Sequence, residues 1–576
     1  MRRVWQIRES DPALADHLAG ALDVHPLVAR LLTQRGIASE GQGREFLSPT
    51  LADLHEPGLM KGMPEAVDRM VRAVKAGEQV CIYGDYDVDG VTSVSLLALF
   101  LREVGLTPDY FIPSRLREGY GLNPESVAAI AAKGTGLLVT VDCGISDQEE
   151  IQQARDAGME AIIIDHHQVP GQLPPAVAIL DPHQPGCQFP AKDLAAVGVT
   201  FNLVMALRAR LREMGQFRHS RHQEEPNLRE YLDLVALGTV ADIVPLLDEN
   251  RIITHFGLNE LTAGRRPGVA ALKDVAGMLA KQVAVGQVAF RLAPRINAVG
   301  RLGEASRAVE LLTTNSYSQA LKLARELDKA NSERQSIEQR ILKQAQEKAQ
   351  IAVDRGDAAL VLASEEWHPG VIGIVASKLV DRFVRPVVMI ALDGEQGRGS
   401  ARGTEQVHLY QALVACADTL RAFGGHRAAA GLSIARERVD DFRAAFMSQV
   451  QEVVSREPAE KKIMVDGEVQ PSEFDHQLVE QLGVMAPHGL GNPEPLFIAR
   501  NLAVKSFRTV GREPPYHLKM ALAQGGQTWD AIGFGMGDRA KDVIDYVDLV
   551  YTPEFNTWEG KVSIQLKLRD LKPCVR

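Results

Sequence analysis

Cysteine is scarce in this chain, and the cysteines that occur lie far apart. The 576 residues include five cysteines, and no two of them form a CxxC pair. This spacing argues against a disulfide framework and against a zinc site built from cysteine. Unpaired cysteines fit a reducing compartment, so we expect a cytoplasmic protein.

Long apolar runs are missing as well. No uncharged apolar segment reaches the roughly 18 residues that a transmembrane helix needs. The arginines Arg2 and Arg3 are not followed by the apolar core of a secretory signal. We therefore expect no association with a membrane.

A surplus of basic residues is also absent. The chain has 64 Lys and Arg against 74 Asp and Glu, a formal charge of −10. Proteins that coat nucleic acid by bulk attraction are usually basic, so this class is disfavoured. A nuclease is compatible with the charge, because metal-binding carboxylates count as negative while a local groove can be basic. No GxxxxGK[ST] loop occurs, so ATP-driven helicase activity is not expected.

Residues 79–180 alternate short apolar runs with amphipathic helical stretches. The runs lie at 80–83, 109–112, 137–141, 161–164 and 177–180, and the helical stretches at 91–104, 124–133 and 147–157. Buried strands that alternate with helices indicate a parallel sheet covered on both faces. The sequence thus predicts an α/β domain.

A long helix is predicted to connect this domain to the rest of the chain. Residues 316–355 contain no glycine or proline, and apolar residues recur three or four apart, which is typical of one long helix or two nearly continuous ones. Such a helix spans on the order of 60 Å, too long for one small domain. A second α/β stretch follows at 358–454, and from residue 463 short alternating strands predict an OB-like β-barrel or a sandwich.

The size of the chain predicts several domains, because single cores stop growing well below this length. The expected division is an N-terminal segment 1–60, a catalytic α/β domain 61–315, the connecting helix 316–355, a second α/β domain 356–460 and the barrel 461–576.

The strongest local signal is the acidic turn YGDYDVDG at 83–90, directly after the first strand of the α/β domain. Asp85, Asp87 and Asp89 repel one another unless solvent or a cation separates them. A solvated turn is the alternative to a metal site. An EF-hand loop also begins DxDxDG, but its twelfth position must be glutamate and is Leu96 here, so that interpretation fails.

Further acids and histidines follow other predicted strands. Asp142 ends one strand, Asp165, His166 and His167 end another, and Asp242 ends a further apolar stretch. Each alone is more often a cap or a turn residue. Because the carboxyl ends of parallel strands share one edge of the sheet, we expect Asp87, Asp89, Asp142, His166 and His167 to converge in one crevice, with Asp242 as one more carboxylate. Oxygen ligands with one or two imidazoles favour Mn²⁺ or Mg²⁺ over structural zinc.

These motifs resemble the DHH phosphoesterase superfamily. The resemblance extends to the RecJ exonucleases through APRINAVGRL at 293–302, WHPG at 367–370, GSAR at 399–402, GGHRAAAG at 424–431 and GLGNPEP at 489–495. It covers nearly the whole chain in the order of that family. It implies a 5′-to-3′ exonuclease that acts on single-stranded DNA in recombinational and mismatch repair. It further implies single-stranded-DNA-binding protein and a RecQ-type helicase as partners, and we expect a monomer.

The resemblance also implies roles for individual residues. The implied metal ligands of a two-metal site are Asp87, Asp89, Asp142, His166 and Asp242. His167 is expected to act beside the metals on the phosphate or the leaving group, and Asp85 to support or bind one metal. Tyr83 stands where many members of the superfamily have a histidine, so the ligand set is open at that point.

A second set of residues is implied to bind DNA or its 5′-phosphate. It comprises Arg115, Arg295, Asn297, Arg301, Ser400, Arg402, His426 and Arg427. For any one of these, ordinary surface polarity is the alternative.

The predicted barrel combines aromatic and basic residues, as an OB-fold that stacks bases and follows the DNA backbone does. They are Phe507, Tyr516, Trp529, Tyr551, Phe555, Trp558, Lys505, Arg508, Arg512, Lys519, Lys561 and Lys567, and half of the aromatics are expected in the core. Two other classes of function stay open. One is a DHH enzyme for small substrates, either a phosphodiesterase of short oligonucleotides or cyclic dinucleotides or a pyrophosphatase. The other is a non-catalytic DNA-binding scaffold. The barrel disfavours the small substrates, and the intact carboxylates disfavour the scaffold.

Overall fold

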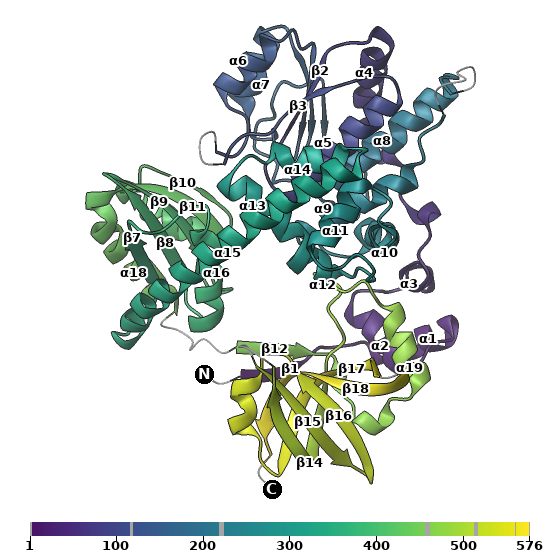
Figure 1. Ribbon diagram of the computed structural model, residues 1–576, viewed down its shortest axis with the longest axis vertical. Coiled ribbons are helices and arrows are strands. Elements are labelled where there is room, and N and C mark those ends of the chain that lie inside the picture. Colours follow the sequence, from purple (N-terminus) through teal and green to yellow (C-terminus); the bar gives the residue numbers. More distant parts are fainter. Residues whose placement is uncertain are drawn as a thin grey trace. The chain divides into compact units, whose positions relative to one another are not determined.

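The structure is a computed structural model that describes residues 3–115, 119–217, 224–454, 461–511, 516–558 and 560–574 (Figure 1). Contacts between Cα atoms divide the chain into two compact units. One unit contains Pro57–Asp242 and Asn259–Lys461, and the other contains Met1–Glu56, Ile243–Leu258 and Lys462–Arg576. Within the described ranges, no helix is long and apolar enough to cross a membrane.

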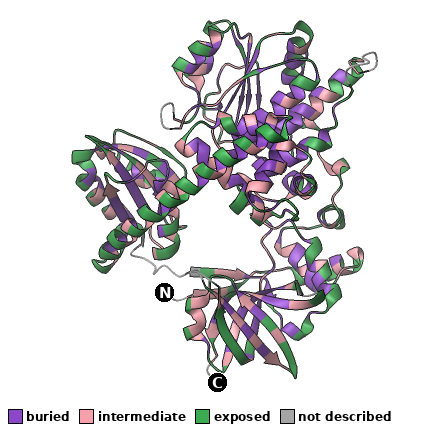
Figure 2. Cartoon of the chain, viewed as in Figure 1, coloured by how far each residue is buried: buried purple, intermediate pink, exposed green. Residues whose placement is uncertain are grey.

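The first part of the Pro57–Lys461 unit is a parallel sheet with the strand order β3-β2-β4-β5-β6. Its strands are β2 (Val80–Gly84), β3 (Asp109–Phe111), β4 (Leu137–Val141), β5 (Glu160–Ile164) and β6 (Ala178–Leu180). The helices α6 (Pro124–Ala131) and α7 (Gln148–Asp156) lie on one face, and α4 (Met63–Ala76), α5 (Val88–Glu103) and α8 (Ala196–Glu213) on the other (Figure 1). The predicted α/β domain is confirmed, and cover on both faces explains why β2 and β4 are buried along their whole length (Figure 2).

A group of helices follows this sheet and leads into the predicted connector. They are α9 (Leu232–Ala241), α10 (Asp248–Ala263), α11 (Pro267–Val275), α12 (Val285–Gln287), α13 (Ala293–Leu302) and α14 (Ser306–Thr313). The connector is one helix of 38 residues, α15 (Tyr317–Asp354), and the side chain of Ser316 caps its N-terminus by accepting from the Gln319 N–H. One continuous helix is therefore present where the sequence left one or two open.

The second α/β part has a mixed sheet with the strand order β10-β11-β9-β8-β7. Its strands are β7 (Leu360–Ser364), β8 (Val387–Asp393), β9 (Gln396–Arg402), β10 (Ala422–Gly425) and β11 (Ala429–Ala435), and its helices are α16 (Ile372–Phe383), α17 (Leu409–Val414) and α18 (Val439–Val454). One face of this sheet packs on α15 and α16 through Ile341, Ala345 and Val375. The connecting helix is thus part of the core of this domain.

The other unit contains the C-terminal barrel. Its strands are β13 (Gly467–Glu468), β14 (Phe497–Val510), β15 (His517–Gln524), β16 (Gln527–Gly533), β17 (Tyr546–Trp558) and β18 (Lys561–Pro573). They follow the order β13-β14-β15-β16-β18-β17, and the pairing of β14 with β17 closes the barrel. The OB-like barrel is confirmed, although β14, with 14 residues, is longer than the short strands expected.

The N-terminal segment belongs to the same unit as the barrel. It forms β1 (Arg3–Ile7), α1 (Pro12–Leu22), α2 (Pro26–Gln34) and α3 (Glu40–Leu47), and β1 pairs with β12 (Lys461–Val465). Leu27, Leu31 and Leu32 of α2 share a core with α19 (His476–Val484) and with the barrel residues Phe497 and Tyr551. Segments at opposite ends of the sequence therefore bury one another's apolar side chains.

Candidate active site

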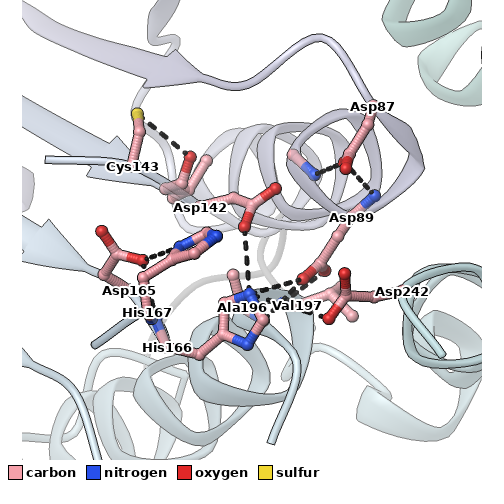
Figure 3. A network of polar contacts seen from close by, with 12 residues as sticks. Asp87, Asp89, Asp142, Cys143, Asp165, His166, His167, Ala196, Val197 and Asp242 are labelled. Atoms are coloured by element: carbon pink, nitrogen blue, oxygen red, sulfur yellow. Dashed lines mark hydrogen bonds and ion pairs between the residues drawn. The ribbon is translucent and has the colours of Figure 1, made fainter. Parts of the chain in front are cut away.

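The predicted acids and histidines converge at one edge of the parallel sheet (Figure 3). Asp85, Asp87 and Asp89 follow β2, Asp142 follows β4, and Asp165, His166 and His167 follow β5. Asp242 comes from the C-terminus of α9 and not from a strand. This arrangement is the one expected of a ligand site at the carboxyl ends of parallel strands.

The acidic turn is held in place by the start of α5. Asp87 is the N-cap of this helix, and its Oδ1 accepts hydrogen bonds from the N–H groups of Asp89 at 2.8 Å and Gly90 at 3.1 Å. A Cβ on Gly90 would lie 2.4 Å from the backbone oxygen of Asp85, so a glycine is required for the chain to turn this closely. The turn therefore presents three carboxylates with little freedom to move apart.

Asp89 is fixed by a second helix. Its carboxylate accepts hydrogen bonds from the N–H groups of Ala196 at 2.7 Å and Val197 at 2.8 Å, at the N-terminus of α8. The partial positive charge of a helix N-terminus stabilises a carboxylate at this position. Asp89 is 1% exposed, so it depends on these two donors or on a cation for its charge.

His166 lies at the centre of the cluster. Its Nε2 is 3.4 Å from Asp142 Oδ1, 3.7 Å from Asp242 Oδ2 and 4.0 Å from Asp89 Oδ2. This nitrogen is buried and, among the described residues, has no hydrogen-bond partner; the same holds for Asp85 Oδ1. Buried polar atoms without partners are rare in native proteins, and a site for a bound ion is one ordinary explanation.

Three overlapping sets of side chains have ligand atoms within 4.8 Å of one another. They are Asp89, His166 and Asp242; Asp85, Asp87 and Asp142; and Asp142, His166 and His167. Asp142 and His166 each belong to two sets. Carboxylate oxygens with one imidazole suit Mn²⁺ or Mg²⁺, so the donors present fit the predicted cofactor.

The electrostatics of the cluster favour a bound cation. Burial first, and then the charges of neighbouring carboxylates, raise the pKa of Asp85 and Asp142 and bring the pKa of Asp89 and Asp242 to about 7. Burial lowers the pKa of His166, which keeps its imidazole neutral, the form that binds metals. The metal-free cluster therefore takes up protons, and a divalent cation would release them.

His167 has a separate environment from His166. Its Nδ1 lies 2.7 Å from Asp165 Oδ1, and that carboxylate also accepts from the N–H groups of His166, His167 and Ile145. Burial opposes protonation, but Asp165 raises the pKa of His167 to about 9, and His167 in turn lowers the pKa of Asp165 against the effect of burial. The two side chains therefore form a close pair in which Asp165 favours the imidazolium form of His167.

Sequence analysis gave no role to Asp165 or to Tyr120. The Tyr120 hydroxyl lies 3.2 Å from both the Asp142 backbone oxygen and His167 Nδ1. The position of Asp165 directly before two histidines could have suggested that it orients one of them, because a carboxylate often orients a functional imidazole. Nothing local in the sequence indicates the position of Tyr120.

Tyr83 does not lie among the candidate ligands. Its side chain is fully buried, stacks on Phe111 and donates its hydroxyl hydrogen to the Gly121 backbone oxygen at 2.9 Å. Residue 83 lies inside β2, where it contributes to the hydrophobic core on the α6 and α7 side of the sheet. Position 83 therefore contributes no ligand atom to the described cluster, whereas Asp85 does.

Arg115, Ser400 and Arg402 line one cavity of about 470 Å³. Arg402 donates to Ser400 Oγ at 3.1 Å, and a Cβ on Gly373 would lie 2.9 Å from that oxygen. Gly373 therefore allows both side chains to lie against the first turn of α16, where N–H groups attract anions. Neither Arg115 nor Arg402 forms an ion pair with an acidic residue within the part of the chain that the structure describes, and the guanidinium of Arg115 lies 5.2 Å from the Tyr86 ring.

The remaining candidates for DNA binding are not all at this cavity. Arg301 donates a hydrogen bond of 3.1 Å to the backbone oxygen of Gly370, a residue that lines the cavity. Arg295 instead forms an ion pair with Asp328 at 2.9 Å. His426 and Arg427 are exposed and are not among the lining residues, and Asn297 is partly buried. The structure thus brings four of the eight predicted residues together at one place.

The candidate DNA-binding residues of the barrel divide between core and surface. Tyr551 is buried and Trp529 packs against the core, whereas Phe507 is 47% exposed and Tyr516 44%. Phe555, Lys505, Arg508 and Lys561 are also exposed, Lys519 is half-buried, and Lys567 pairs with Glu494. Arg512 and the side chain of Trp558 lie outside the described residues.

Comparisons with known proteins agree with this architecture. Residues 79–239 match the DHH family, N-terminal domain, residues 356–452 the DHHA1 domain, and residues 465–570 the RecJ OB domain. The single-stranded-DNA-specific exonuclease RecJ of Dickeya dadantii is 40% identical, and the match covers 100% of both chains. The protein of that name from Escherichia coli is 37% identical over 96% of each chain, and that from Bacillus subtilis is 36% identical over 98% of this chain and 70% of its own.

A solved structure agrees over the whole chain. The crystal structure of RecJ in complex with Mn²⁺ from Thermus thermophilus has a TM-score of 0.84 and 30% identity, and the match covers 100% of this chain and 80% of that one. Near-complete coverage by several relatives above 30% identity leaves one assignment. The chain belongs to the RecJ family of single-stranded-DNA-specific exonucleases.

Proposed function

We propose that this protein hydrolyses single-stranded DNA from its 5′ end with Mn²⁺ or Mg²⁺ at the acidic cluster. The observation that carries the proposal is the position of Asp142 and His166, which are shared between neighbouring sets of ligand atoms, with the buried Nε2 of His166 unpaired. Relatives solved with Mn²⁺ and with Mg²⁺ support the choice of cation.

The side chains of the cluster divide into two groups around Asp142. Asp89, His166 and Asp242 would hold one cation, and Asp85 and Asp87 a second, with Asp142 between them. When bound, such a pair supplies a nucleophilic water and neutralises charge that develops on the phosphate. The protein itself holds the carboxylates rigidly through α5 and α8, so that little reorganisation accompanies the reaction.

His167 is placed to handle a proton beside the cluster. Asp165 fixes its Nδ1 and favours the imidazolium, so its Nε2 can donate to a phosphate oxygen or to the leaving 3′-oxygen. A divalent cation at the neighbouring ligands would oppose this charge and lower the pKa of His167. His167 thus fits the role of a general acid with Asp165 as its orienting partner.

Degradation in one direction along the strand requires a group that recognises the strand's end, because hydrolysis at the cluster could proceed from either end. The cavity that contains Arg115, Ser400 and Arg402 is also lined by Arg398, so three arginines, a hydroxyl and the first turn of α16 surround it. A guanidinium group can bind two phosphate oxygens at once through two parallel hydrogen bonds, and helix N-termini attract anions. We assign this terminal-phosphate pocket to the 5′-phosphate of the strand.

The barrel is proposed to hold the strand without taking part in the reaction. Phe507 and Tyr516 are exposed aromatics, and Lys505 and Arg508 are exposed cations on the same strand as Phe507. Stacked bases contribute on the order of 1–3 kcal/mol each. A monomeric, cytoplasmic enzyme of DNA repair that meets single-stranded-DNA-binding protein and a RecQ-type helicase completes the proposal.

One set of substrates tests the function. The protein is incubated with Mn²⁺ and single-stranded DNA labelled at the 5′ or the 3′ end, duplex DNA, dinucleotides or pyrophosphate. The proposal predicts rapid release of a labelled mononucleotide from the 5′ label and slow shortening of the 3′-labelled strand. Preferential turnover of dinucleotides or pyrophosphate would favour a small-substrate phosphodiesterase. Binding without any hydrolysis would favour a scaffold.

A further inference from the structure

One aspartate directly follows each of four neighbouring strands of the parallel sheet. The last residues of β2, β4, β5 and β6 lie in register with one another. The residues that come next are all buried aspartates, namely Asp85, Asp142, Asp165 and Asp181. The first two belong to the sets of candidate metal ligands, and Asp165 fixes His167. Asp181 is the member of this row that the proposed reaction leaves without a role.

Backbone hydrogen bonds continue the row beyond the ends of the strands. The Asp142 N–H donates to the Ile164 oxygen at 3.0 Å, and the Asp165 N–H donates to the Leu180 oxygen at 2.9 Å. The ladder therefore extends one residue past the ends of β4 and β5. Neighbouring strands lie about 4.8 Å apart, so Asp181 lies directly beside the residue that orients His167.

Asp181 and His183 repeat the arrangement of Asp165 and His167. Asp165 Oδ1 accepts from the His167 N–H at 3.2 Å and lies 2.7 Å from His167 Nδ1. Asp181 Oδ1 accepts from the His183 N–H at 2.7 Å and lies 3.5 Å from His183 Nδ1. Both carboxylates are fully buried, and the two histidine side chains are 34% and 29% exposed. Asp181 Oδ2 and His183 Nδ1 are buried without a hydrogen-bond partner among the described residues, so the second pair is incompletely satisfied.

Two lysines lie against the turn that contains His183. Lys192 Nζ donates to the backbone oxygen of Pro182 at 3.0 Å, and Lys61 Nζ donates to that of Pro185 at 2.9 Å. Backbone oxygens carry no full negative charge, so these contacts place two ammonium groups beside a partly exposed imidazole. Such a combination of donors attracts an anion.

The order of the strands places this turn on the opposite side of the cluster from the terminal-phosphate pocket. The sheet runs β3-β2-β4-β5-β6, and Arg115 follows β3, with its guanidinium 5.2 Å from the ring of Tyr86 in the acidic turn. Four strand spacings put β3 and β6 about 19 Å apart, and the acids and histidines that follow β2, β4 and β5 lie between them. A DNA strand held by its 5′-phosphate beside β3 and hydrolysed at the cluster would leave over β5 and β6.

We propose that His183 binds the DNA phosphate that follows the scissile one, with Asp181 as its positioning residue. An imidazole donates through both nitrogens only when it is protonated. His183 can then face Asp181 with Nδ1 and donate from Nε2 to a phosphate oxygen. His183 thus contacts the part of the strand that stays bound after hydrolysis, and not the reacting atoms. This inference rests on the proposed direction of hydrolysis.

The test removes the charge of one DNA phosphate at a time. Single strands with a 5′-phosphate carry one neutral methylphosphonate at either the second or the fourth linkage, and the first linkage is the one hydrolysed. The measurement is kcat/KM for release of the first nucleotide by the full chain with Mn²⁺. Dividing the value for the unmodified strand by that for the modified strand gives the sensitivity to each neutral linkage.

The variants should differ at the second linkage. The unchanged protein should lose about 10-fold in kcat/KM when this linkage is neutral, and His183→Ala less than about 3-fold, because no imidazole is left to bind the phosphate. Asp181→Asn should fall between the two, since His183 stays but loses its charged partner. His17→Ala changes an exposed histidine of the other unit and should keep the full sensitivity. A neutral fourth linkage should affect the unchanged protein and His183→Ala equally.

The outcomes distinguish this inference from the function on which it rests. If the unchanged protein tolerates a neutral second linkage, or if His183→Ala stays as sensitive to it as the unchanged protein, the binding role of His183 is refuted. A purely structural histidine predicts that second result, because its loss lowers kcat/KM on both strands alike. Degradation of the unmodified strand from its 3′ end would instead refute the proposed direction of hydrolysis. Each variant must show a cooperative thermal transition, and His183→Phe, which keeps a ring without a donor, provides the same test if His183→Ala does not fold.

Discussion

Replacing Asp242 with asparagine should stabilise the metal-free protein and weaken its response to metal. In the metal-free cluster, burial and the charge of Asp87 raise the pKa of Asp242 from an ordinary 3.8 to about 7. Within the described residues no backbone N–H donates to the Asp242 carboxylate, whereas two donate to that of Asp89, so asparagine removes charge without removing a fixed acceptor. The change therefore isolates the cost of the buried charge.

The magnitude follows from the linkage between protonation and folding. A pKa difference between 3.8 and about 7 corresponds to about 4 kcal/mol when the group is fully ionised. Because the side chain is 24% exposed and shares its field with other carboxylates, we expect roughly 2–4 kcal/mol. A raised carboxylate pKa means that this cost is absent below pH 3.8 and grows as the pH rises to about 7. The unit that contains Asp242 is large, so its unfolding entropy is on the order of 0.8 kcal/mol/K, and the variant should gain about 2–5 °C in melting temperature at pH 8 in EDTA and little at pH 4.

Manganese should reverse the order of stability. A ligand at a hundred times its Kd stabilises a protein by about 2.7 kcal/mol per site, and Asp242→Asn loses one ligand of that site. The assay is thermal unfolding of both proteins at pH 8, in EDTA and in excess Mn²⁺, with the exposed Asp156→Asn as the matched control. If Asp242→Asn melts below the unchanged protein in EDTA, or gains as much from Mn²⁺, the proposed electrostatic role of the residue is refuted.

Three further outcomes are expected. Asp142→Ala should reduce kcat by more than about 10³-fold, because the residue belongs to two ligand sets; near-normal turnover with unchanged Mn²⁺ dependence would contradict the site. His167→Ala should reduce kcat by about 10²–10⁴-fold while the rise in melting temperature with Mn²⁺ persists, and loss of that rise would make His167 a metal ligand. Phe507→Ala should weaken binding of long single strands by roughly 1–3 kcal/mol without changing kcat at saturation; a binding isotherm identical to that of the unchanged protein would remove Phe507 from the DNA path.

The local pattern of the sequence was sufficient for the secondary structure around the site. Strand 137–141 coincides with β4, and the run without glycine or proline coincides with the single helix α15. Hydrophobic periodicity carries this information because strands covered on both faces and long amphipathic helices need regular apolar residues. The convergence of Asp87, Asp142 and His166 also followed from sequence, since parallel strands end at a common edge.

The partners of individual side chains depended on tertiary structure. Sequence could not show that Arg295 is paired with Asp328 on α15, or that Arg115 shares a cavity with Arg402, because these contacts join segments far apart in the chain. The surroundings of Tyr83 could not be predicted for a similar reason. Its position one residue before the end of β2 directs it into the core, and only the position of α6 and α7 shows which face of the sheet is buried there.

The assembly of the barrel unit was also decided in three dimensions. Sequence analysis separated residues 1–60 from the barrel, but Leu27 and Leu31 are buried in the same core as Phe497. Arg251, on the segment between the two halves of the other unit, donates to backbone oxygens of Phe46 and Met485 and so joins all three segments of this unit. A chain that ends before the barrel would expose these leucines, so the boundary near residue 460 is not a place where the protein can be cut.

Motifs and periodicity determined the family, the α/β fold and the metal-binding residue types, because these depend on residues close together in the sequence. Which side chains meet the phosphate, and which segments share a core, depended on contacts between distant parts of the chain that no local pattern encodes.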